Sequence, residues 1–172
     1  MNRILIFIVV VLVGLGLGMG GIAGALTVEE LDASGLDHFG KAFYEATPQK
    51  DQEKATTEYG LAEEAFQEAI RIQPDWVEPY LHLGRTYFVQ KKYPLAAEAY
   101  RTALTIAPER KEVYLQLASA LEMGGDYAGA VGVLQNLRAQ ETDAQAISIL
   151  DDFIARIQAR GQAAPKAPGG AK

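Results

Sequence analysis

The sequence contains no cysteine, two histidines and one tryptophan among its 172 residues. Without cysteine thiolates the chain cannot form disulfides, thiolate zinc sites, iron–sulfur clusters or a covalently attached c-type haem. Basic residues are also scarce: 16 Lys and Arg are set against 22 Asp and Glu, which gives a formal net charge of −6. A protein that neutralises nucleic-acid phosphates needs a surplus of positive charge. We therefore expect no nucleic-acid partner.

Motifs that mark catalytic or cofactor sites are also missing. The sequence has no glycine-rich phosphate loop, no nucleophile elbow and no metal-ligand spacing. His38 and His82 lie 44 residues apart and could approach each other across neighbouring repeats, but a metal site needs further ligands and a second shell. We interpret them as ordinary polar-face histidines. The sequence predicts no catalytic residue, no metal site and no cofactor, and hence no enzyme.

An uncharged apolar run from Ile4 to Val28 follows Arg3 at the N-terminus. As a helix, such a run would be roughly 37 Å long, which is enough to cross a hydrocarbon core of about 30 Å. Arg3 precedes the run, and Glu29 and Glu30 follow it. Positive charge stays on the cytoplasmic side of a membrane. Residues 1–28 are therefore predicted to form a single-pass anchor in the cytoplasmic membrane, with the remaining chain on the extracytoplasmic (periplasmic) side.

A secretory signal peptide is the alternative for the same segment. Ala23-Gly24-Ala25 has the small-x-small pattern of a cleavage site. Cleavage near Ala25 would leave a soluble periplasmic protein. The apolar stretch is longer than the roughly 7–15 residues of a usual signal core, so the retained anchor is the favoured interpretation.

The apolar run contains six glycines, all from position 14 onward. Pairs four residues apart let a second helix backbone approach closely, although glycine is also common in membrane helices generally. On the first interpretation the anchor packs inside a membrane protein complex. The predicted packing positions are Gly14, Gly16, Gly18, Gly20 and Gly24.

A motif recurs every 34 residues through the rest of the chain. Tyr59, Tyr93 and Tyr127 follow this step, and so do Pro74 and Pro108. A fixed period of this size predicts one helical hairpin that is copied and stacked. An all-α fold is therefore expected.

The clearest copy, residues 77–110, resembles the tetratricopeptide repeat. Its first helix shows the pattern Tyr80-x-x-Leu83-Gly84-x-x-Tyr87, and its second shows Ala96-x-x-x-Tyr100, Ala103 and Pro108. The next copy, residues 111–142, keeps the register with Ala118 in place of the glycine. The resemblance implies a right-handed α-solenoid of about three hairpins that carries a docking surface and no chemistry.

The first copy, residues 34–74, is interrupted. Its first helix is predicted from Leu36-x-x-Phe39-Gly40-x-x-Phe43, so Gly40 is matched to Gly84. A polar insertion is expected at about 47–57, read as a turn with possible lengthening of the helices.

The chain after the third repeat is predicted to form one more helix, residues 143–160, that covers the open end of the array. Thr142 and Gln145 have the spacing of a capping box. Residues 161–172, rich in Ala, Pro, Gly and Lys, are expected to be a disordered tail.

The resemblance also implies a groove lined by the first helices of the repeats. Leu81, Phe88 and Val89 are predicted to form a second apolar stripe that needs a partner, unless neighbouring helices cover them. Asp37 and Leu81 stand where the family's clamp for acidic C-terminal peptides needs other residues, so we expect no heat-shock chaperone tail as ligand. The groove positions carried over from the family are Lys41, Tyr44, Leu81, Arg85, Phe88, Val89, Leu115, Ser119 and Glu122.

The sequence thus predicts a non-enzymatic, membrane-anchored scaffold. It would bind partner proteins on the extracytoplasmic side and stabilise a membrane protein complex. The alternative is a transient assembly factor or chaperone for exported envelope or cytochrome proteins.

Overall fold

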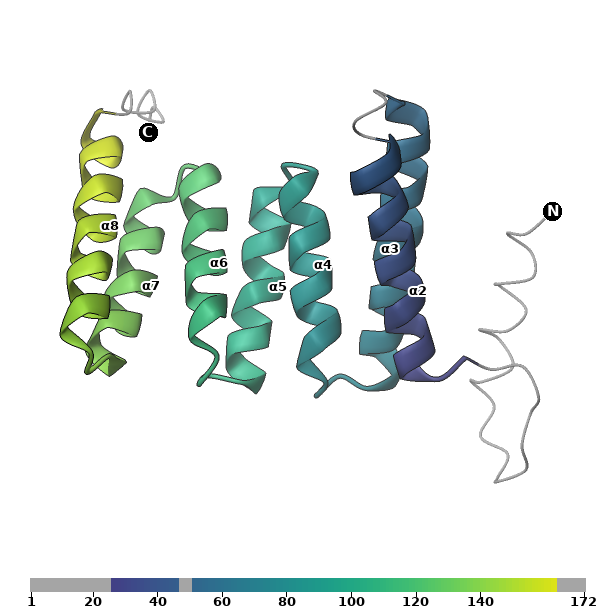
Figure 1. Ribbon diagram of the computed structural model, residues 1–172, viewed down its shortest axis with the longest axis horizontal. Helices are drawn as coiled ribbons and strands as arrows, with labels where there is room; N and C mark the ends of the chain where they lie inside the picture. Colours follow the sequence, from purple (N-terminus) through teal and green to yellow (C-terminus); the bar gives the residue numbers. More distant parts are fainter. Residues whose placement is uncertain (1–25, 47–50, 164–172) are drawn as a thin grey trace, which may run out of the picture.

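Seven α-helices and one short π-helix make up most of the described part of the chain, residues 26–46 and 51–163 of the computed structural model. They stand side by side in one row (Figure 1). In chain order they are α2 (Val28–Gly40), η1 (Lys41–Ala46), α3 (Gln52–Ile72), α4 (Val77–Val89), α5 (Tyr93–Ile106), α6 (Lys111–Met123), α7 (Tyr127–Gln140) and α8 (Ala144–Ala163).

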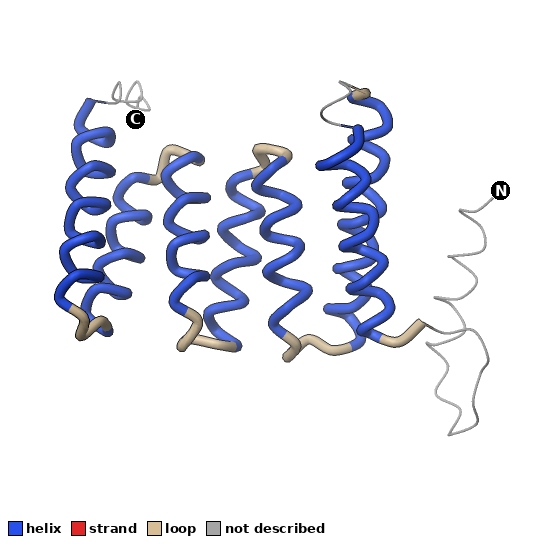
Figure 2. Tube along the Cα trace, in the orientation of Figure 1, coloured by secondary structure: helices blue, strands red, loops and turns tan. Residues whose placement is uncertain are grey.

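Neighbouring helices pair into three hairpins, α2 with α3, α4 with α5 and α6 with α7, and α8 packs on α7. Short loops join the helices from α3 onward, and the described residues contain no strand (Figure 2). The prediction of an all-helical repeat solenoid is confirmed. The predicted membrane helix, its glycines and the C-terminal tail lie almost wholly outside the described residues. Within residues 26–46 and 51–163, no helix has both the length and the apolar character needed to cross a membrane.

The repeated geometry extends to individual hydrogen bonds. The Tyr80 hydroxyl donates to the Pro74 carbonyl oxygen at 3.0 Å. One period later, the Tyr114 hydroxyl donates to the Pro108 carbonyl oxygen at 3.1 Å. Each bond ties the start of a first helix to the proline that ends the preceding repeat, so the same contact recurs at both junctions.

Close helix crossing explains the glycine of the repeat motif. A Cβ at Gly84 would lie 2.6 Å from Cε1 of Tyr100, which is buried on the facing helix. In the first hairpin the residue in this position is Gly35, where a Cβ would overlap the ring of Phe66. A Cβ at Gly40 would meet nothing within 4 Å. The predicted match of Gly40 to Gly84 is therefore wrong by five residues.

The corrected register places the extra residues of the first repeat. Helices α2 and α4 each have 13 residues and begin 49 positions apart, 15 more than the period. The surplus lengthens both helices of the hairpin: α2 continues into η1, and α3 has 21 residues where α5 has 14. Residues 52–57 are thus helical, which is the lengthening that the sequence left open at these positions rather than a turn.

The start of the array also differs from the prediction. Helix α2 begins at Val28, six residues before the expected repeat boundary. Thr27 and Glu30 form a reciprocal capping box, in which each side chain accepts a backbone N–H of the other. The end of the predicted anchor, at Thr27 and Val28, is therefore part of the helix start.

Helix α8 continues the repeat register and is the last helix of the described residues. Its apolar residues Leu150, Ile154 and Ile157 are buried against α7. The positions that would face a further helix are polar or small: Ser148, Asp151, Asp152 and Ala155. The N-cap is Asp143, which accepts the Ala146 N–H at 2.7 Å. The predicted capping box from Thr142 to Gln145 is not formed.

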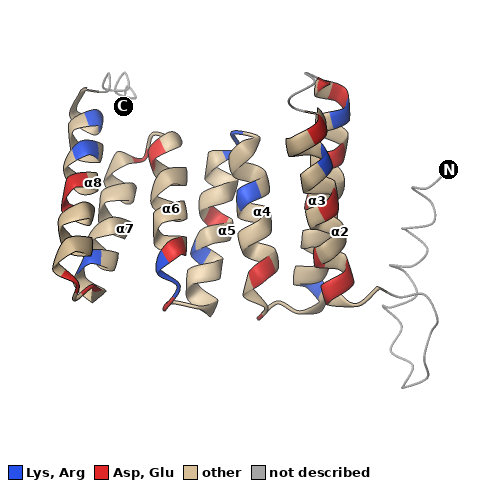
Figure 3. Ribbon diagram, viewed as in Figure 1, with Lys and Arg blue, Asp and Glu red and all other residues tan. Residues whose placement is uncertain are grey.

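Charged residues occur along the whole row but are sparse on α7, where Arg138 is the one charged side chain (Figure 3). Helix α7 also carries Gly129 and Gly132 in its interior. Each interior glycine lowers helix stability by roughly 1 kcal/mol relative to alanine. These two glycines therefore give α7 a low intrinsic helix propensity.

Candidate partner-binding face

Equivalent positions on successive first helices form one face of the array. Leu81 and Arg85 of α4 are followed 34 residues later by Leu115 and Ser119 of α6. The same step reaches Ile149 and Phe153 of α8. We call this set the first-helix face: Leu81, Arg85, Leu115, Ser119, Ile149 and Phe153.

Apolar side chains on this face become more exposed toward α8. Leu81 is half-buried, whereas Leu115 is 43% exposed, Ile149 is 51% exposed and Phe153 is 38% exposed. The Arg156 guanidinium lies over the Phe153 ring, 4.3 Å from its centroid. This contact supports the aromatic ring at the surface. The exposed apolar part of the face therefore lies on α6 and α8.

The stripe predicted on α4 is largely covered. Leu81, Phe88 and Val89 pack against the hydrophobic core and are only partly accessible. The Phe88 ring meets the Tyr93 ring edge-on, with centroids 5.5 Å apart. The sequence left open whether these three residues bind a partner or are covered by neighbouring helices, and in the structure they are largely covered.

The register shift moves the positions predicted on the first repeat. Leu36 and Phe39 occupy the places equivalent to Arg85 and Phe88, whereas Lys41 and Tyr44 lie beyond them on η1. The Arg85 guanidinium lies 4.8 Å from the centroid of the Phe39 ring. Lys41 and Tyr44 are therefore not aligned with the groove positions of α4 and α6.

Ion pairs fix some of the predicted residues. Lys41 bonds the Asp37 carboxylate at 2.5 Å, and this bond lowers the pKa of the Asp37 carboxyl. The Glu122 carboxylate accepts a hydrogen bond from the Arg160 guanidinium of α8 at 2.5 Å. Ser119, also on α6, is exposed. The bond from Glu122 ties α6 to α8 beside the exposed apolar residues.

The two histidines bind different carboxylates. His38 Nδ1 lies 2.7 Å from Glu58 of α3, and His82 Nδ1 lies 2.7 Å from the buried Asp32 of α2. They do not share a repeat position, because in the corrected register Ala33 is equivalent to His82. Within the described residues no group of three metal-binding side chains occurs.

Sequence reasoning missed Ile149 and Phe153, because it interpreted the helix after the third repeat only as a cover for the array. The signal that could have found them is the 34-residue step itself, which reaches them from Leu115 and Ser119. Helix α8 thus adds a further unit to the first-helix face.

Two family models match the chain, and both describe a tetratricopeptide repeat. One covers residues 55–110 and the other covers residues 89–152. No curated protein matches in a sequence search.

Solved structures of other proteins share the fold, among them the following three. The TPR2B domain of yeast Sti1, in a complex with pHsp70, has a TM-score of 0.58 and 18% identity over 77% of this chain and 97% of that one. The Yersinia enterocolitica type III secretion translocator chaperone SycD has a TM-score of 0.58 and 16% identity over 84% and 97%. The Sgt2 TPR domain from Aspergillus fumigatus has a TM-score of 0.57 and 18% identity over 89% and 94%.

Proposed function

The chain carries tetratricopeptide repeats, and from this premise we propose that it is a non-enzymatic scaffold that binds a partner protein through the first-helix face. Repeat arrays of this kind present an extended surface built from equivalent positions of successive units. The expected partner is a segment that places apolar side chains along one side, as an amphipathic helix or an extended strand does.

One observation carries this proposal: Leu115 and Ile149 are exposed at equivalent positions of α6 and α8, and Phe153 is exposed beside Ile149 at the position equivalent to Ser119. Single exposed apolar residues are normal on a protein surface. Several of them on the same face of successive first helices are more typical of an interaction site. Arg85 at one end and the Glu122–Arg160 pair at the other supply polar groups at the edge of the apolar part.

We also propose that residues 1–28 anchor the scaffold in the cytoplasmic membrane, with the repeats on the extracytoplasmic side. The support is the uncharged run from Ile4, the position of Arg3 before it and the carboxylates after it. Bound there, the scaffold would stabilise a membrane protein complex, and the glycines of the run would pack against other subunits. Cleavage near Ala25 would give a soluble periplasmic form.

The second candidate is a transient assembly factor or chaperone for exported proteins. It is favoured by the shared fold with a translocator chaperone, SycD. We still expect no heat-shock chaperone tail as ligand. In the corrected register the residue at the clamp position of the first repeat is Asp32 instead of Asp37, and its carboxylate likewise does not suit an acidic peptide.

The test uses the full-length chain, tagged and extracted in mild detergent, with co-purified proteins quantified by mass spectrometry. The variant Leu115→Ser with Phe153→Ser is compared with Leu95→Ser. Leu95 on α5 is a matched control because it is apolar and 44% exposed but lies off the first-helix face. The double variant should reduce the recovered partner at least about tenfold, which corresponds to roughly 1.4 kcal/mol, and Leu95→Ser should not.

Equal losses in both variants, or none in the double variant, would remove the first-helix face from the proposal. A partner recovered in fixed proportion would support the permanent subunit. Recovery only after chemical cross-linking would support the transient factor. The same spectra report whether residues 1–25 remain attached.

A further inference from the structure

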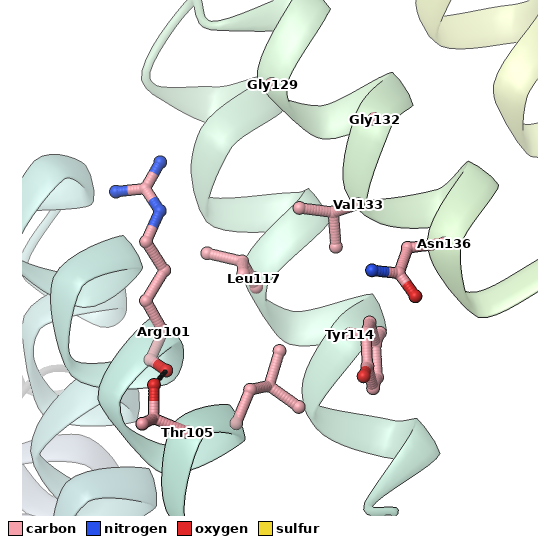
Figure 4. Close-up of a pocket in the computed structure, with 9 residues that line it drawn as sticks. Arg101, Thr105, Tyr114, Leu117, Gly129, Gly132, Val133 and Asn136 are labelled. Atoms are coloured by element: carbon pink, nitrogen blue, oxygen red, sulfur yellow. Dashed lines mark hydrogen bonds between the residues drawn. The ribbon is translucent and has the colours of Figure 1, made fainter. Parts of the chain in front are cut away.

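A shallow, open hollow of about 440 Å³ lies between α5 and α7, over α6 (Figure 4). On α6 it is lined by Tyr114 and Leu117, which point to nearly the opposite side of that helix from Leu115 and Ser119. The hollow is therefore separate from the first-helix face. The lining residues that matter for its chemistry are Arg101, Leu104, Leu117, Gly132, Val133 and Asn136.

The hollow exists because α7 has glycine where α5 has a side chain. Gly132 is equivalent to Glu98, and Gly129 to Leu95. A Cβ at Gly132 would meet nothing within 4 Å, and among the described glycines only Gly125 has a positive φ. Neither backbone conformation nor packing against the described residues requires glycine at position 132. A glycine of this kind is typical of a place where another molecule approaches the backbone.

The lining of the hollow is mixed, with aliphatic and polar side chains in similar measure, and its rim carries one positive charge. Leu104, Leu117 and Val133 supply aliphatic surface from three helices. Arg101 is the one charged residue of the lining, and it forms no ion pair with any residue that the structure describes. The equivalent positions on α3 and α7 are the uncharged Gln67 and Gln135. The cation is thus specific to this junction.

The polar groups at the other end of the hollow already have partners within the chain. The Tyr114 hydroxyl donates to the Pro108 carbonyl oxygen at 3.1 Å, and Asn136 Oδ1 accepts from the Gln140 amide at 2.6 Å. The exposed Arg101 guanidinium, which has no ion pair among the described residues, is therefore open to an anionic group, and an arginine fork matches a carboxylate.

We propose that this hollow binds an acidic segment of a partner protein. An aliphatic side chain of that segment lies over Gly132, against Leu117 and Val133. The carboxylate of an adjacent Asp or Glu pairs with Arg101. An open hollow suits a side chain that projects from a peptide, because an isolated small molecule would leave much of its surface in water.

The experiment selects displayed seven-residue peptides on the full-length chain in mild detergent, with several variants as parallel baits. Gly132→Leu fills the hollow. Gly60→Leu is the matched control, because Gly60 is also a helical glycine with nothing within 4 Å of an added Cβ, and it lies on α3. Arg101→Gln removes the charge and introduces the residue found at the equivalent positions.

Peptides with an aliphatic residue next to Asp or Glu should be enriched on the wild type and on Gly60→Leu. They should be at least tenfold fewer on Gly132→Leu, while Arg101→Gln should lose the preference for the acidic residue. Thermal unfolding of Gly132→Leu should occur at or above the wild-type temperature. If that variant unfolds early, Gly132→Glu, which copies the residue of α5, fills the same space.

Retention of the same peptides by both variants of Gly132, or enrichment of basic or purely apolar peptides, would overturn the proposal. The variants Leu115→Ser and Phe153→Ser should leave the selected peptides unchanged. Failure of the first-helix face as a binding site would therefore not imply failure of the hollow.

Discussion

Gly84 and Tyr100 form a matched pair at the crossing of α4 and α5: the phenol ring fills the space that a side chain at position 84 would need. Burial raises the pKa of the Tyr100 hydroxyl to about 12. Gly35 and Phe66 form the same pair in the first hairpin. In the third hairpin the equivalent residues are Ala118 and Leu134, both buried. Glycine thus faces an aromatic ring in the first two hairpins, whereas alanine faces the smaller leucine side chain in the third.

The size match predicts the effect of Gly84→Ala. Its methyl group would lie 2.6 Å from the ring, and overpacking of this kind costs about 1–3 kcal/mol of unfolding free energy. Adding Tyr100→Leu should recover part of that loss, because it creates the combination found in the third hairpin. Urea unfolding followed by circular dichroism measures both variants.

Gly40→Ala serves as the control for this prediction, because nothing lies within 4 Å of an added Cβ at Gly40. It should leave stability unchanged or raise it, as alanine favours a helix. A loss equal to that of Gly84→Ala would show that crowding against Tyr100 is not the cause.

Lys91 and Gly125 occupy equivalent turns and share a left-handed backbone, with φ of 62° and 86°. This conformation costs a residue with a Cβ about 1–2 kcal/mol. Lys91 is exposed, so Lys91→Gly should raise the free energy of unfolding by up to about 1 kcal/mol, the entropy of glycine offsetting part of the gain. Gly125→Lys should lower it. Thermal melts of the two variants test this, and their shifts in unfolding temperature relative to the wild type must have opposite signs.

The buried Asp32 carboxylate joins the first hairpin to the second through His82. Asp32→Ala leaves the imidazole without this partner, so we expect a loss of about 1–3 kcal/mol. The loss should be accompanied by faster amide exchange in α2. Asp37→Ala on the same helix breaks only the exposed pair with Lys41 and should change stability little. Similar effects from both substitutions would contradict a special role for the buried contact.

Glu141 predicts a pH dependence. The Lys111 ammonium and the backbone N–H groups of Thr142 and Asp143 lower the pKa of its carboxyl to about 2. Because the folded pKa lies below the ordinary value of 4.5, the contribution to stability is complete above pH 4.5 and is lost as pH falls toward 2. Glu141→Gln should therefore unfold at a lower temperature than the wild type at pH 7. The gap should narrow steadily between pH 4.5 and pH 2, and a constant gap would exclude this cause.

The sequence was sufficient for the hairpins from α4 onward, because the 34-residue step fixes which residues share a face. It misplaced α2, because Gly40 follows Phe39 in the same pattern as Gly84 follows Leu83. The contact that identifies Gly35 instead is with the ring of Phe66, and it depends on how two helices cross. Local spacing does not contain that information.

The candidate site shows the same limit. Leu81 and Leu115 occupy one repeat position, yet Leu81 packs against the core and Leu115 is exposed. The difference comes from neighbouring side chains in each unit. The hollow beside Gly132 could not be predicted from the sequence either, because a glycine inside a helix indicates only a lower helix propensity.

The side of α8 that corresponds to the α7-facing side of α6 carries polar or small residues. On α6 the side that meets α7 carries Tyr114, Leu117 and Leu121, whereas α8 has Ser148, Asp151 and Ala155 at the same places. Asp151 is further held by Arg138. A second molecule that approached end-on with an apolar helix would have to strip water from these carboxylates. This side of α8 thereby discourages end-on stacking of a second molecule, and with it head-to-tail polymerisation into filaments, a hazard for any protein built from interchangeable units.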